Sequence, residues 1–330
     1  MALVERVALG ASGLEITRLA LGCAPIGGLF EPVAEDDARA TVVAAYAAGV
    51  RTFDTAPLYG YGTSERRLGA ALAGHPRDEL VVSTKVGRLL EPRDGGPVEQ
   101  AEAWPDAPSL RPVFDFSRDG VLRSLEASLE RLGMDRIDLA LIHDPDDHLE
   151  QALRETAPAL ASLRDEGVIA AFGAGMNQAP ALARFVRETD VDCVLVAGRY
   201  TLLDQSAADE LLPACLEHEV AVLAGGVFNS GVLAGPAARA AYDYRAAPPG
   251  VVERAGRIGA VCARYGLPIA AAAMAFPLRH PAVRAVVVGA RSPDEMATDA
   301  ALFARRVPAA LWDELAYEGL LGHAEVPTAR

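Results

Sequence analysis

The feature that most constrains this chain is a repeated alternation of short apolar segments with longer stretches of helical periodicity. The predicted strands are residues 19–22, 51–54, 80–85, 138–142, 170–174, 193–197, 220–224 and 285–288. The predicted helices are residues 34–48, 64–73, 119–132, 149–166, 179–188, 204–218, 251–265 and 294–303. Strands that each precede a helix favour a closed parallel sheet, the (β/α)8 or TIM barrel of the α/β class.

Two further segments lie outside this repeat. Residues 7–9 and 14–16 predict a small N-terminal hairpin, and residues 308–319 predict an extra C-terminal helix. The connections 86–118 and 225–250 are long enough to predict binding loops or lids. A doubly wound open sheet is the alternative, but no GxGxxG motif opens the first helix. Since no linker or low-complexity break divides the chain, we expect one barrel domain over residues 1–330.

Charge and cysteine usage limit the classes of partner. Asp and Glu number 45 against 31 Lys and Arg, for a net charge of -14, which disfavours binding to nucleic acid and to anionic membrane surfaces. The four cysteines form no CxxC pair, so free thiols in a reducing compartment are expected. We find no signal-peptide pattern and no apolar run of the ~18 residues that span a bilayer. The chain is therefore predicted to be cytoplasmic and to bind neither membrane nor nucleic acid, with its oligomeric state left open.

Four groups that carry protons or charge follow three neighbouring predicted strands. Asp54 ends the second strand, Tyr59 lies in the loop after it, Lys85 ends the third and His143 follows the fourth. Active sites of barrels lie at these strand ends. A phenol with a pKa near 10 is a poor acid at neutral pH. An ammonium about 4 Å away contributes about 4 kcal/mol at an effective dielectric of 20, so Lys85 is expected to lower the pKa of Tyr59 to about 7.

The other two groups of this set have supporting tasks in the prediction. Asp54 would hold Lys85 charged and in place, and His143 would donate a hydrogen bond to a substrate oxygen or to the tyrosinate. Each of the four has an ordinary alternative as a cap, a packed aromatic, a surface lysine or an interior histidine. Their convergence at neighbouring strand ends favours proton transfer coupled to another bond change, without a nucleophile or a metal.

A metal site has little support in the sequence. The six histidines include no HxH or HExxH pair. Asp144, Asp146 and Asp147 follow His143 closely, but the simpler interpretation is that they cap the turn before the helix at residue 149. We therefore predict no metal.

Three segments together resemble one enzyme family. FDTAPLYG, STKVG and LIHDPD are similar, in this order, to the tetrad segments of the aldo-keto reductase superfamily, and the likeness covers essentially the whole chain. The resemblance implies an oxidoreductase in which the four groups above are the catalytic tetrad, with Tyr59 as general acid in reduction and general base in oxidation. It also implies NAD or NADP bound in an extended form across the barrel mouth.

Finer segments resemble one bacterial branch of that family. SLERLGMDRIDLALIHDPDDH, VAGRYTLLDQ and GGVFNSGVLAG look like the branch with L-fucose dehydrogenase, D-threo-aldose 1-dehydrogenase and pyridoxal 4-dehydrogenase. This likeness implies oxidation of the anomeric hydroxyl of an aldose such as L-fucose, L-galactose or D-arabinose to a lactone. Oxidation of pyridoxal, or general reduction of aldehydes and ketones, stays open as the alternative.

The same resemblance assigns a cofactor site, supported by a glycine-rich loop whose backbone N–H groups suit a pyrophosphate. The predicted cofactor-binding residues are Cys23, Asn177, Gly226, Val227, Phe228, Asn229, Ser230, Gly231, Arg291, Ser292, Glu295 and Asp299. Glu295 stands where NADP-preferring members often carry a basic residue. Because a carboxylate repels a 2′-phosphate, NAD is favoured over NADP. Trp104 and Phe116, both from a long loop, are predicted at the substrate.

Two other classes of function compete with this prediction. Lys85 on a barrel strand could form a Schiff base in a lyase, with Tyr59 as proton carrier, although Asp54 would keep that lysine charged. The barrel could also be a non-catalytic nicotinamide-binding sensor, which sequence alone leaves open.

Overall fold

The sheet of this protein closes on itself in the computed structural model, which describes residues 5–93, 95, 101–235, 241–243 and 245–321. The barrel strands are β3 (Leu19–Gly22), β4 (Thr52–Asp54), β5 (Val81–Val86), β8 (Leu139–His143), β9 (Ala171–Met176), β10 (Cys193–Ala197), β11 (Ala221–Gly225) and β14 (Val283–Gly289). All are parallel, and β14 pairs with β3 to close the barrel. The predicted (β/α)8 fold is confirmed, and each strand overlaps the segment that the apolar pattern predicted.

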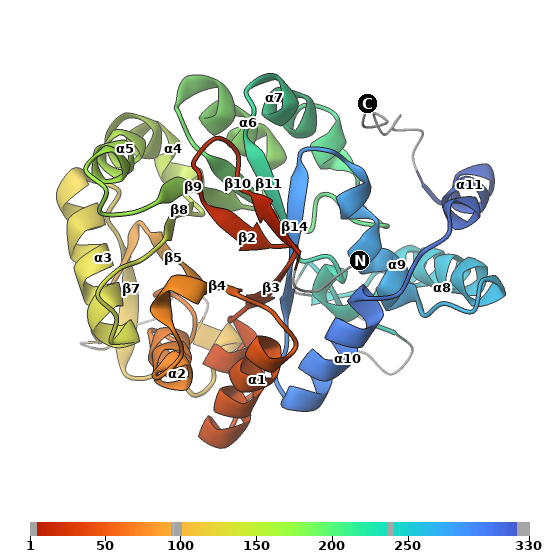
Figure 1. Cartoon of the computed structure of the whole chain (residues 1–330), viewed down its shortest axis with the longest axis horizontal. Helices are drawn as coiled ribbons and strands as arrows, with labels where there is room; N and C mark the ends of the chain where they lie inside the picture. Colours follow the sequence, from red (N-terminus) through yellow and green to blue (C-terminus); the bar gives the residue numbers. More distant parts are fainter. Residues whose placement is uncertain (1–4, 94, 96–100, 236–240, 244, 322–330) are drawn as a thin grey trace.

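An outer ring of helices surrounds the strands (Figure 1). The helices are α1 (Glu35–Ala47), α2 (Thr63–Leu72), α3 (Arg118–Leu132), α4 (Leu149–Gln151), α5 (Ala157–Asp165), α6 (Ala179–Glu188), α7 (Leu211–Glu217), α8 (Pro249–Arg264), α9 (Ile269–Ala275), α10 (Pro293–Phe303) and α11 (Ala309–Tyr317). The predicted extra C-terminal helix is α11. The predicted hairpin is the antiparallel pair β1 (Arg6–Ala8) and β2 (Glu15–Thr17).

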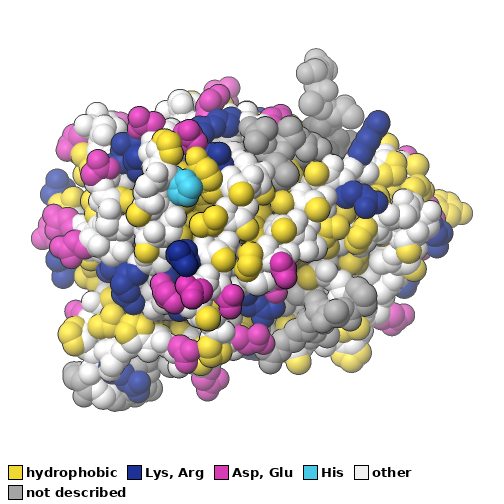
Figure 2. Space-filling view, turned by 60° about the horizontal axis from the view of Figure 1, so that its bottom comes forward, with side chains coloured by type: hydrophobic (Ala, Val, Ile, Leu, Met, Phe, Trp, Pro, Cys, Tyr) yellow, Lys and Arg dark blue, Asp and Glu magenta, His cyan; other side chains and the backbone are white. Residues whose placement is uncertain are grey.

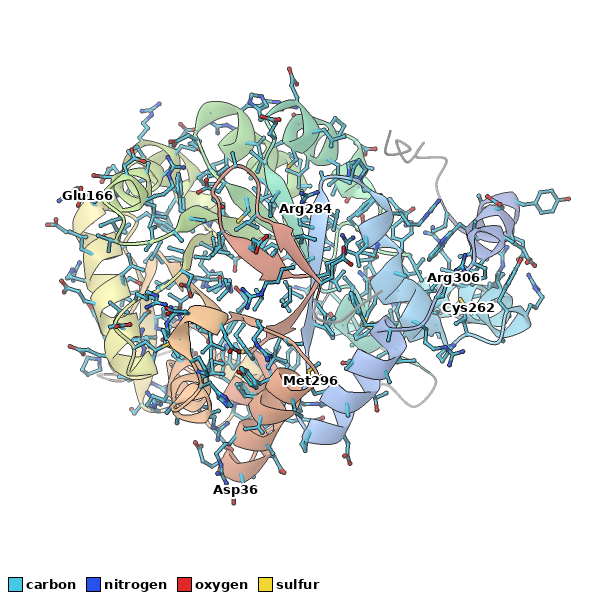
Figure 3. The ribbon with its side chains drawn as sticks, in the orientation of Figure 1. Asp36, Glu166, Cys262, Arg284, Met296 and Arg306 are labelled. Carbon is cyan, nitrogen blue, oxygen red and sulfur yellow. The ribbon has the colours of Figure 1, made fainter. Side chains whose placement is uncertain are left out.

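The hairpin closes the end of the barrel at which the strands begin. Its flanking Leu9 and its Ile16 are fully buried, in one cluster with inward-facing strand residues such as Leu139 and Leu223. Burial of each such side chain stabilises the fold by roughly 1.5–3 kcal/mol. Side chains crowd the barrel axis in Figure 3, whereas Asp36 and Glu166 point outward into solvent. The opposite end of the barrel is thereby left for the long loops.

Two predicted helices are corrected. The helix predicted over residues 204–218 is wrong in its first half, where a short 3-10 turn (Ser206–Ala208) precedes α7. Thr201 and Asp204 accept backbone N–H groups of this segment through their side chains, which competes with helix formation. The helix predicted over residues 149–166 is divided by a π-helical turn (Ala152–Thr156) between α4 and α5.

Both long connections contain a hairpin that the sequence did not predict. The first holds β6 (Arg88–Pro92) and β7 (Leu110–Phe114), and the second holds β12 (Ala241–Tyr242) and β13 (Arg245–Ala246). Residues 94, 96–100, 236–240 and 244 of these connections, and residues 322–330 of the expected domain, lie outside the described residues. The β6–β7 hairpin follows β5 directly, so it stands beside the end of the strand that carries Lys85.

The surface mixes charges of both signs. Acidic and basic side chains are interspersed with hydrophobic ones on the face in Figure 2. The four cysteines are free and buried. Among the described residues, no single helix is long and apolar enough to cross a membrane; one pair, α8 with residues Ile269–Arg279, reaches that length and composition together but bends by 96°.

Candidate active site

The C-terminal ends of three adjacent strands gather the predicted acid–base groups. Lys85 Nζ donates to Asp54 Oδ2 at 2.7 Å and to the carbonyl oxygen of Thr55 at 2.9 Å. Ser83 Oγ donates to the other oxygen of Asp54 at 3.0 Å. The Lys85 side chain is only 2% exposed. This ammonium is therefore buried but well compensated, as a charge inside a protein requires.

Tyr59 lies in the turn between β4 and α2 and completes the set. The Lys85 ammonium is 4.7 Å from the centre of the Tyr59 ring. The ring of His143 meets the Tyr59 ring edge-on at a centroid distance of 5.8 Å. Gly60 and Gly62 in this turn have φ of 59° and 84°, a left-handed backbone that glycine adopts without strain. The structure thus brings together all four residues of the predicted tetrad.

Two buried hydroxyls hold the Tyr59 turn against the strands. Ser64 Oγ donates to the carbonyl oxygen of Cys23 at 2.7 Å and lies 2.8 Å from Thr55 Oγ1. The backbone N–H of Ser64 donates to the carbonyl oxygen of Tyr59 at 3.1 Å. Thr55 and Ser64 are both fully buried. We call Thr55 and Ser64 with these hydrogen bonds the clamp. The Thr55 carbonyl also accepts a hydrogen bond from Lys85, so the clamp links the turn that carries Tyr59 to the ammonium. The sequence analysis missed this connection.

The electrostatics of Tyr59 correct one expectation. Burial raises the pKa of Tyr59 above its usual 10, and this effect and that of Asp54 outweigh the lowering by Lys85. The predicted fall toward 7 is therefore wrong for this structure. The first physical reason is the burial of the phenol, which disfavours its charged form. The second is that Asp54 lies 2.7 Å from the ammonium, so the phenol faces an ion pair instead of a bare positive charge.

The other two titrating groups have well-defined states. Burial alone would lower the pKa of Lys85, but the charge and hydrogen bonds of Asp54 and Tyr59 raise it above its usual value, so the amine stays protonated. Burial, then the charges of Arg88 and Lys85, hold the pKa of His143 well below its usual range. The site therefore combines a neutral phenol, an ammonium and a neutral imidazole.

A charged pair of Arg88 and Asp144 lies beside His143. The sequence analysis missed Arg88 and misassigned Asp144. Arg88 Nη2 lies 3.4 Å from Asp144 Oδ2, and His143 Nε2 lies 3.5 Å from the same oxygen. Asp144 was expected to cap the following turn with its neighbours, but no side-chain cap is present at the turn Asp146–His148 or at α4. That expectation is wrong. The only signal for Arg88 was its place three residues after Lys85, in a segment taken to be a loop.

Asn177 lies at the mouth, at the end of β9, as predicted. Its Nδ2 donates to the carbonyl oxygen of Ala197 at 2.9 Å, and its amide oxygen accepts no hydrogen bond from the described residues. An acceptor in this place suits the amide group of a nicotinamide. Nearby, Asn229 Nδ2 donates to the Gly198 carbonyl at 3.2 Å, while its buried Oδ1 has no partner in the described part of the chain.

The glycine-rich loop after β11 has an unusual backbone. Gly226, Asn229, Ser230 and Gly231 have φ of 60°, 45°, 59° and 109°. Non-glycine residues rarely adopt such values, and runs of left-handed and right-handed residues point successive N–H groups to one side, as anion sites require. Gly226 is exposed and Phe228 half-buried, whereas the Val227 side chain lies in the core. Two N–H groups are already committed within the loop, since Asn229 and Gly231 donate to the carbonyl oxygens of Gly226 and Phe228 at 2.8 and 3.0 Å. The left-handed backbone still suits a phosphate, with Val227 available through its backbone only.

The segment after β14 carries the remaining predicted cofactor residues. Ser292 Oγ accepts the backbone N–H of Glu295 at 3.1 Å and so caps α10. Arg291 pairs with Glu31 at 2.9 Å and with Glu295 at 3.1 Å. Asp299 is one turn further along α10; burial, with the charge of Glu295, raises its pKa to about 7. Carboxylates therefore surround the one arginine of this segment that was expected near a phosphate.

Three predicted contact residues are more buried than expected. The thiol of Cys23 has no exposed surface, and burial raises its pKa. Phe116 is 1% exposed and stacks on Phe114 at 6.1 Å. Trp104 is 4% exposed and packs 5.8 Å from the Tyr59 ring. Trp104 therefore borders the reacting group, Phe116 packs against Phe114, and Cys23 is available through its backbone only.

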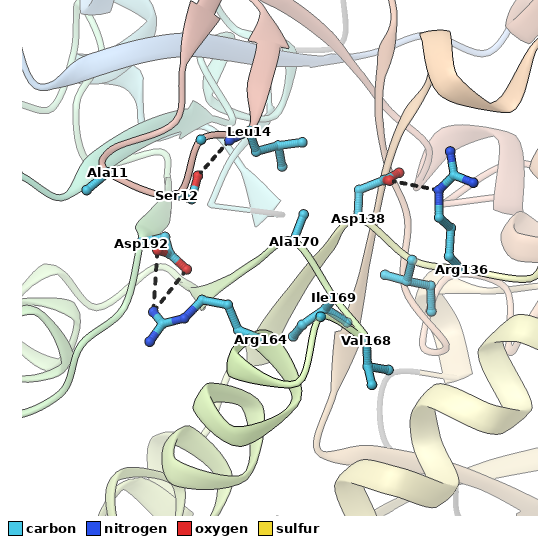
Figure 4. A pocket seen from close by; sticks show the side chains of 13 residues that line it. Ala11, Ser12, Leu14, Arg136, Asp138, Arg164, Val168, Ile169, Ala170 and Asp192 are labelled. Atoms are coloured by element: carbon cyan, nitrogen blue, oxygen red, sulfur yellow. Dashed lines mark hydrogen bonds and ion pairs between the residues drawn. The ribbon is translucent and has the colours of Figure 1, made fainter.

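A hollow of about 740 Å³ lies at the other end of the barrel (Figure 4). It is lined by the β1–β2 turn and by residues that precede β8, β9 and β10. Its charges pair with each other: Arg164 with Asp192 at 3.4 Å and Arg136 with Asp138 at 3.8 Å. Charge pairing at this end of a barrel serves stability, and we place no chemistry here. No group of His, Cys, Asp and Glu suited to a metal occurs among the described residues.

This geometry defines an acid–base enzyme built on a (β/α)8 barrel. The model of the Aldo/keto reductase family matches residues 18–316. The chain is 46% identical to a D-threo-aldose 1-dehydrogenase of Pseudomonas sp over 95% of this chain and 97% of that protein. It is 41% identical to a pyridoxal 4-dehydrogenase of Microbacterium luteolum over 96% and 98%. The chain therefore belongs to the Aldo/keto reductase family, and it is an oxidoreductase of the kind that uses a nicotinamide cofactor.

A solved structure supports the same fold. A glycerol dehydrogenase from Gluconobacter oxydans superposes with a TM-score of 0.78 and 24% identity, covering 100% of this chain and 98% of that one. At this identity the likeness concerns the barrel alone. The expected resemblance to the bacterial aldose and pyridoxal dehydrogenases is confirmed by the two sequence relatives.

Proposed function

We propose that this protein is an NAD-dependent aldose 1-dehydrogenase that oxidises the anomeric hydroxyl of a sugar to a lactone. The observation that carries the proposal is the neutral phenol of Tyr59 set between the Lys85 ammonium and the neutral imidazole of His143. The 46% identical relative, a D-threo-aldose 1-dehydrogenase, supports an aldose as the substrate. L-Fucose, L-galactose and D-arabinose are the first candidates.

In this proposal Tyr59 handles the proton and its neighbours set the geometry. A bound oxidised nicotinamide would supply the hydride acceptor. Tyr59, as tyrosinate, takes the proton of the anomeric hydroxyl as the C–H bond at that carbon breaks, and in reduction its phenol returns the proton. Lys85 stabilises the tyrosinate, and Asp54 holds Lys85 protonated. His143 donates its single N–H to the substrate oxygen and so fixes the reacting carbon.

The cofactor would be NAD. Arg291 is already shared between Glu31 and Glu295, so little positive charge is left for a 2′-phosphate. Asp299 adds a further carboxyl on the same helix. Since like charges repel at short range, this acidic surrounding favours the 2′-hydroxyl of NAD.

The competing functions are less well supported. A Schiff base needs a free amine, whereas Lys85 is buried against Asp54 and its pKa is raised. A non-catalytic sensor would not need the ordered contacts among four proton-handling groups. Oxidation of pyridoxal is the nearest alternative, because a relative of that name is 41% identical. We retain the cytoplasmic location as a prediction, supported by the four free cysteines.

The test is a panel of L-fucose, L-galactose, D-arabinose and pyridoxal with NAD and with NADP, followed at the absorbance of reduced nicotinamide. We expect the highest kcat/KM for an aldose with NAD. Tyr59→Phe should lose turnover by about 10³-fold or more while nicotinamide binding persists. Turnover of pyridoxal alone would overturn the substrate, and unchanged turnover by Tyr59→Phe would overturn the mechanism.

The cofactor preference has its own variant. Glu295→Gln removes the carboxylate and releases Arg291, so the ratio of kcat/KM for NAD over NADP should fall by about 10-fold. Asp294→Asn, which changes the neighbouring exposed carboxylate, is the matched control. A strong NADP preference in the unmodified protein would contradict the assignment of Glu295.

A further inference from the structure

We propose that Arg88 and Asp144 form a hydroxyl-recognition pair, which binds the substrate hydroxyl on the carbon next to the reacting one. The inference deepens the proposed aldose dehydrogenase and rests on it. It assigns the selection of α-hydroxylated substrates over plain aldehydes to these two side chains.

The first support is the position of the pair. Asp144 directly follows His143, and Arg88 begins the strand that leaves the end of β5 three residues after Lys85. The charge of Asp144 contributes to raising the pKa of Tyr59, and the charge of Arg88 contributes to lowering that of His143. The pair therefore lies within electrostatic reach of both groups that hold the reacting oxygen. The carbon one bond further along the substrate would come next to it.

The second support is the partial burial of the pair. The Arg88 side chain is 4% exposed, whereas 26% of the Asp144 side chain remains exposed. The Arg88 guanidinium lies 4.7 Å from the centre of the Phe114 ring, and Phe114 is 39% exposed. The guanidinium packs near the ring, whose exposed part gives an apolar surface for sugar C–H groups. The carboxylate and the ring thus keep exposed surface beside the buried guanidinium.

The third support is the geometry at Asp144. The oxygen Oδ2 lies 3.4 Å from Arg88 and 3.5 Å from His143, longer than the roughly 2.7–2.9 Å of strong charge-assisted hydrogen bonds. Asp144 also has a φ of 41°, in a region that costs a non-glycine residue roughly 1–3 kcal/mol and is enriched at functional sites. The pair thus combines long contacts at Asp144 Oδ2 with a backbone conformation that is typical of functional sites.

The chemistry of a hydroxyl completes the inference. A hydroxyl donates one hydrogen bond and accepts others, so it can donate to Asp144 and accept from Arg88 at the same time. A substrate without that hydroxyl would bury the pair without replacing the hydrogen bonds lost to water, which disfavours its binding. Sites built to bond a hydroxyl reject analogues that lack it far more strongly than apolar pockets do.

The experiment compares D-arabinose with its 2-deoxy analogue, 2-deoxy-D-ribose, in NAD-dependent oxidation by the full-length protein. We expect the unmodified enzyme to prefer D-arabinose in kcat/KM by about 30-fold or more. The isosteric variant Asp144→Asn and the variant Arg88→Lys should each reduce that preference by about 10-fold, because D-arabinose loses more than the deoxy sugar. Binding of NAD, measured by calorimetry, should stay within about twofold.

A matched control lies in the same hairpin. Glu91 and Arg111 form an ion pair between β6 and β7 at 3.1 Å, away from the tetrad strands. Glu91→Gln tests whether breaking any hairpin ion pair alters the preference, and we expect none. If Asp144→Asn lowers kcat/KM equally for both sugars, the pair only tethers the hairpin, and the inference is overturned.

Failure of the proposed function can be distinguished from failure of the inference about Arg88 and Asp144. If the unmodified enzyme oxidises no aldose, the aldose assignment fails. The reduction of glyceraldehyde, which has the adjacent hydroxyl, against propanal, which lacks it, then tests the pair alone. A preference for glyceraldehyde that falls in Asp144→Asn supports the pair, and the absence of any preference overturns it.

Discussion

The two ends of this barrel carry similar charged residues and use them differently. At the end where the strands finish, Lys85 and Asp54 are 2% and 6% exposed, and their pair lies against the phenol of Tyr59. At the end where the strands begin, Arg164 and Asp192 are 20% and 8% exposed and belong to a network of ion pairs. Asp192 also accepts the backbone N–H of Phe172 at 2.9 Å, which ties the start of β9 to the neighbouring strand.

The difference teaches that an ion pair alone does not mark a site. The pairs at the hairpin end contact backbone and each other, so their effect is on folding. The Lys85–Asp54 pair at the loop end contacts Tyr59, a group that can exchange a proton. Substitutions should therefore affect rate at one end and stability at the other.

The largest effect is expected for Lys85→Met. Without the ammonium, the tyrosinate form of Tyr59 loses its stabilising charge, so kcat should fall by about 10³-fold or more. Asp54 would be left as a buried, unpaired charge, which should also cost roughly 3–5 kcal/mol of unfolding free energy. Steady-state kinetics and urea unfolding measure the two effects.

The double variant Lys85→Met with Asp54→Asn separates these effects. The neutral amide removes the unpaired charge, so most of the lost stability should return while kcat stays low. If kcat recovers together with the stability, the Lys85–Asp54 pair acts on folding only. The ion pairs at the two ends of the barrel would then have the same role.

The next largest effect concerns pH. Since burial holds the pKa of Tyr59 above its usual 10, the fraction of tyrosinate should increase with pH across the neutral range. We expect kcat/KM for oxidation to rise about tenfold per pH unit between roughly pH 7 and 9, without a plateau, whereas reduction should not gain. A plateau beginning near pH 7 would instead support the lowered pKa expected from the sequence.

A smaller effect is expected for the clamp. Thr55→Val keeps the shape of the side chain but removes its hydrogen bond to Ser64, so the Tyr59 turn should loosen and kcat should fall by about 10-fold. Thr55→Ser retains the hydroxyl and should restore kcat. If both variants lose kcat alike, packing of the methyl group matters and the hydrogen bond does not.

The smallest effect on rate is expected at the hairpin end. Asp192→Asn weakens the bonds to Arg164 and Phe172, which should cost roughly 1–3 kcal/mol of unfolding free energy while kcat changes less than about twofold. Asp165, which is 71% exposed, also pairs with Arg164, and Asp165→Asn should cost under about 1 kcal/mol. A loss of kcat in Asp192→Asn would contradict the division between the two ends.

The sequence alone determined the barrel and the identity of the four acid–base candidates. Periodicity places apolar strands before helices, and a closed parallel sheet directs the residues at strand ends to one face. Asp54, Lys85 and His143 could be found this way because they end a strand or lie next to its end. Tyr59 was found by its short distance in sequence from Asp54.

Only the tertiary structure decided how those groups titrate and which neighbours they have. The pKa of Tyr59 depends on burial and on the 2.7 Å pair of Lys85 with Asp54. Neither can be predicted from the residues next to Tyr59 in the sequence. Arg88 meets Asp144 across 56 positions of chain, from a hairpin that no periodicity predicted. Local pattern sets backbone form and strand-end position, whereas the energy of a charge depends on all the atoms that the fold brings around it.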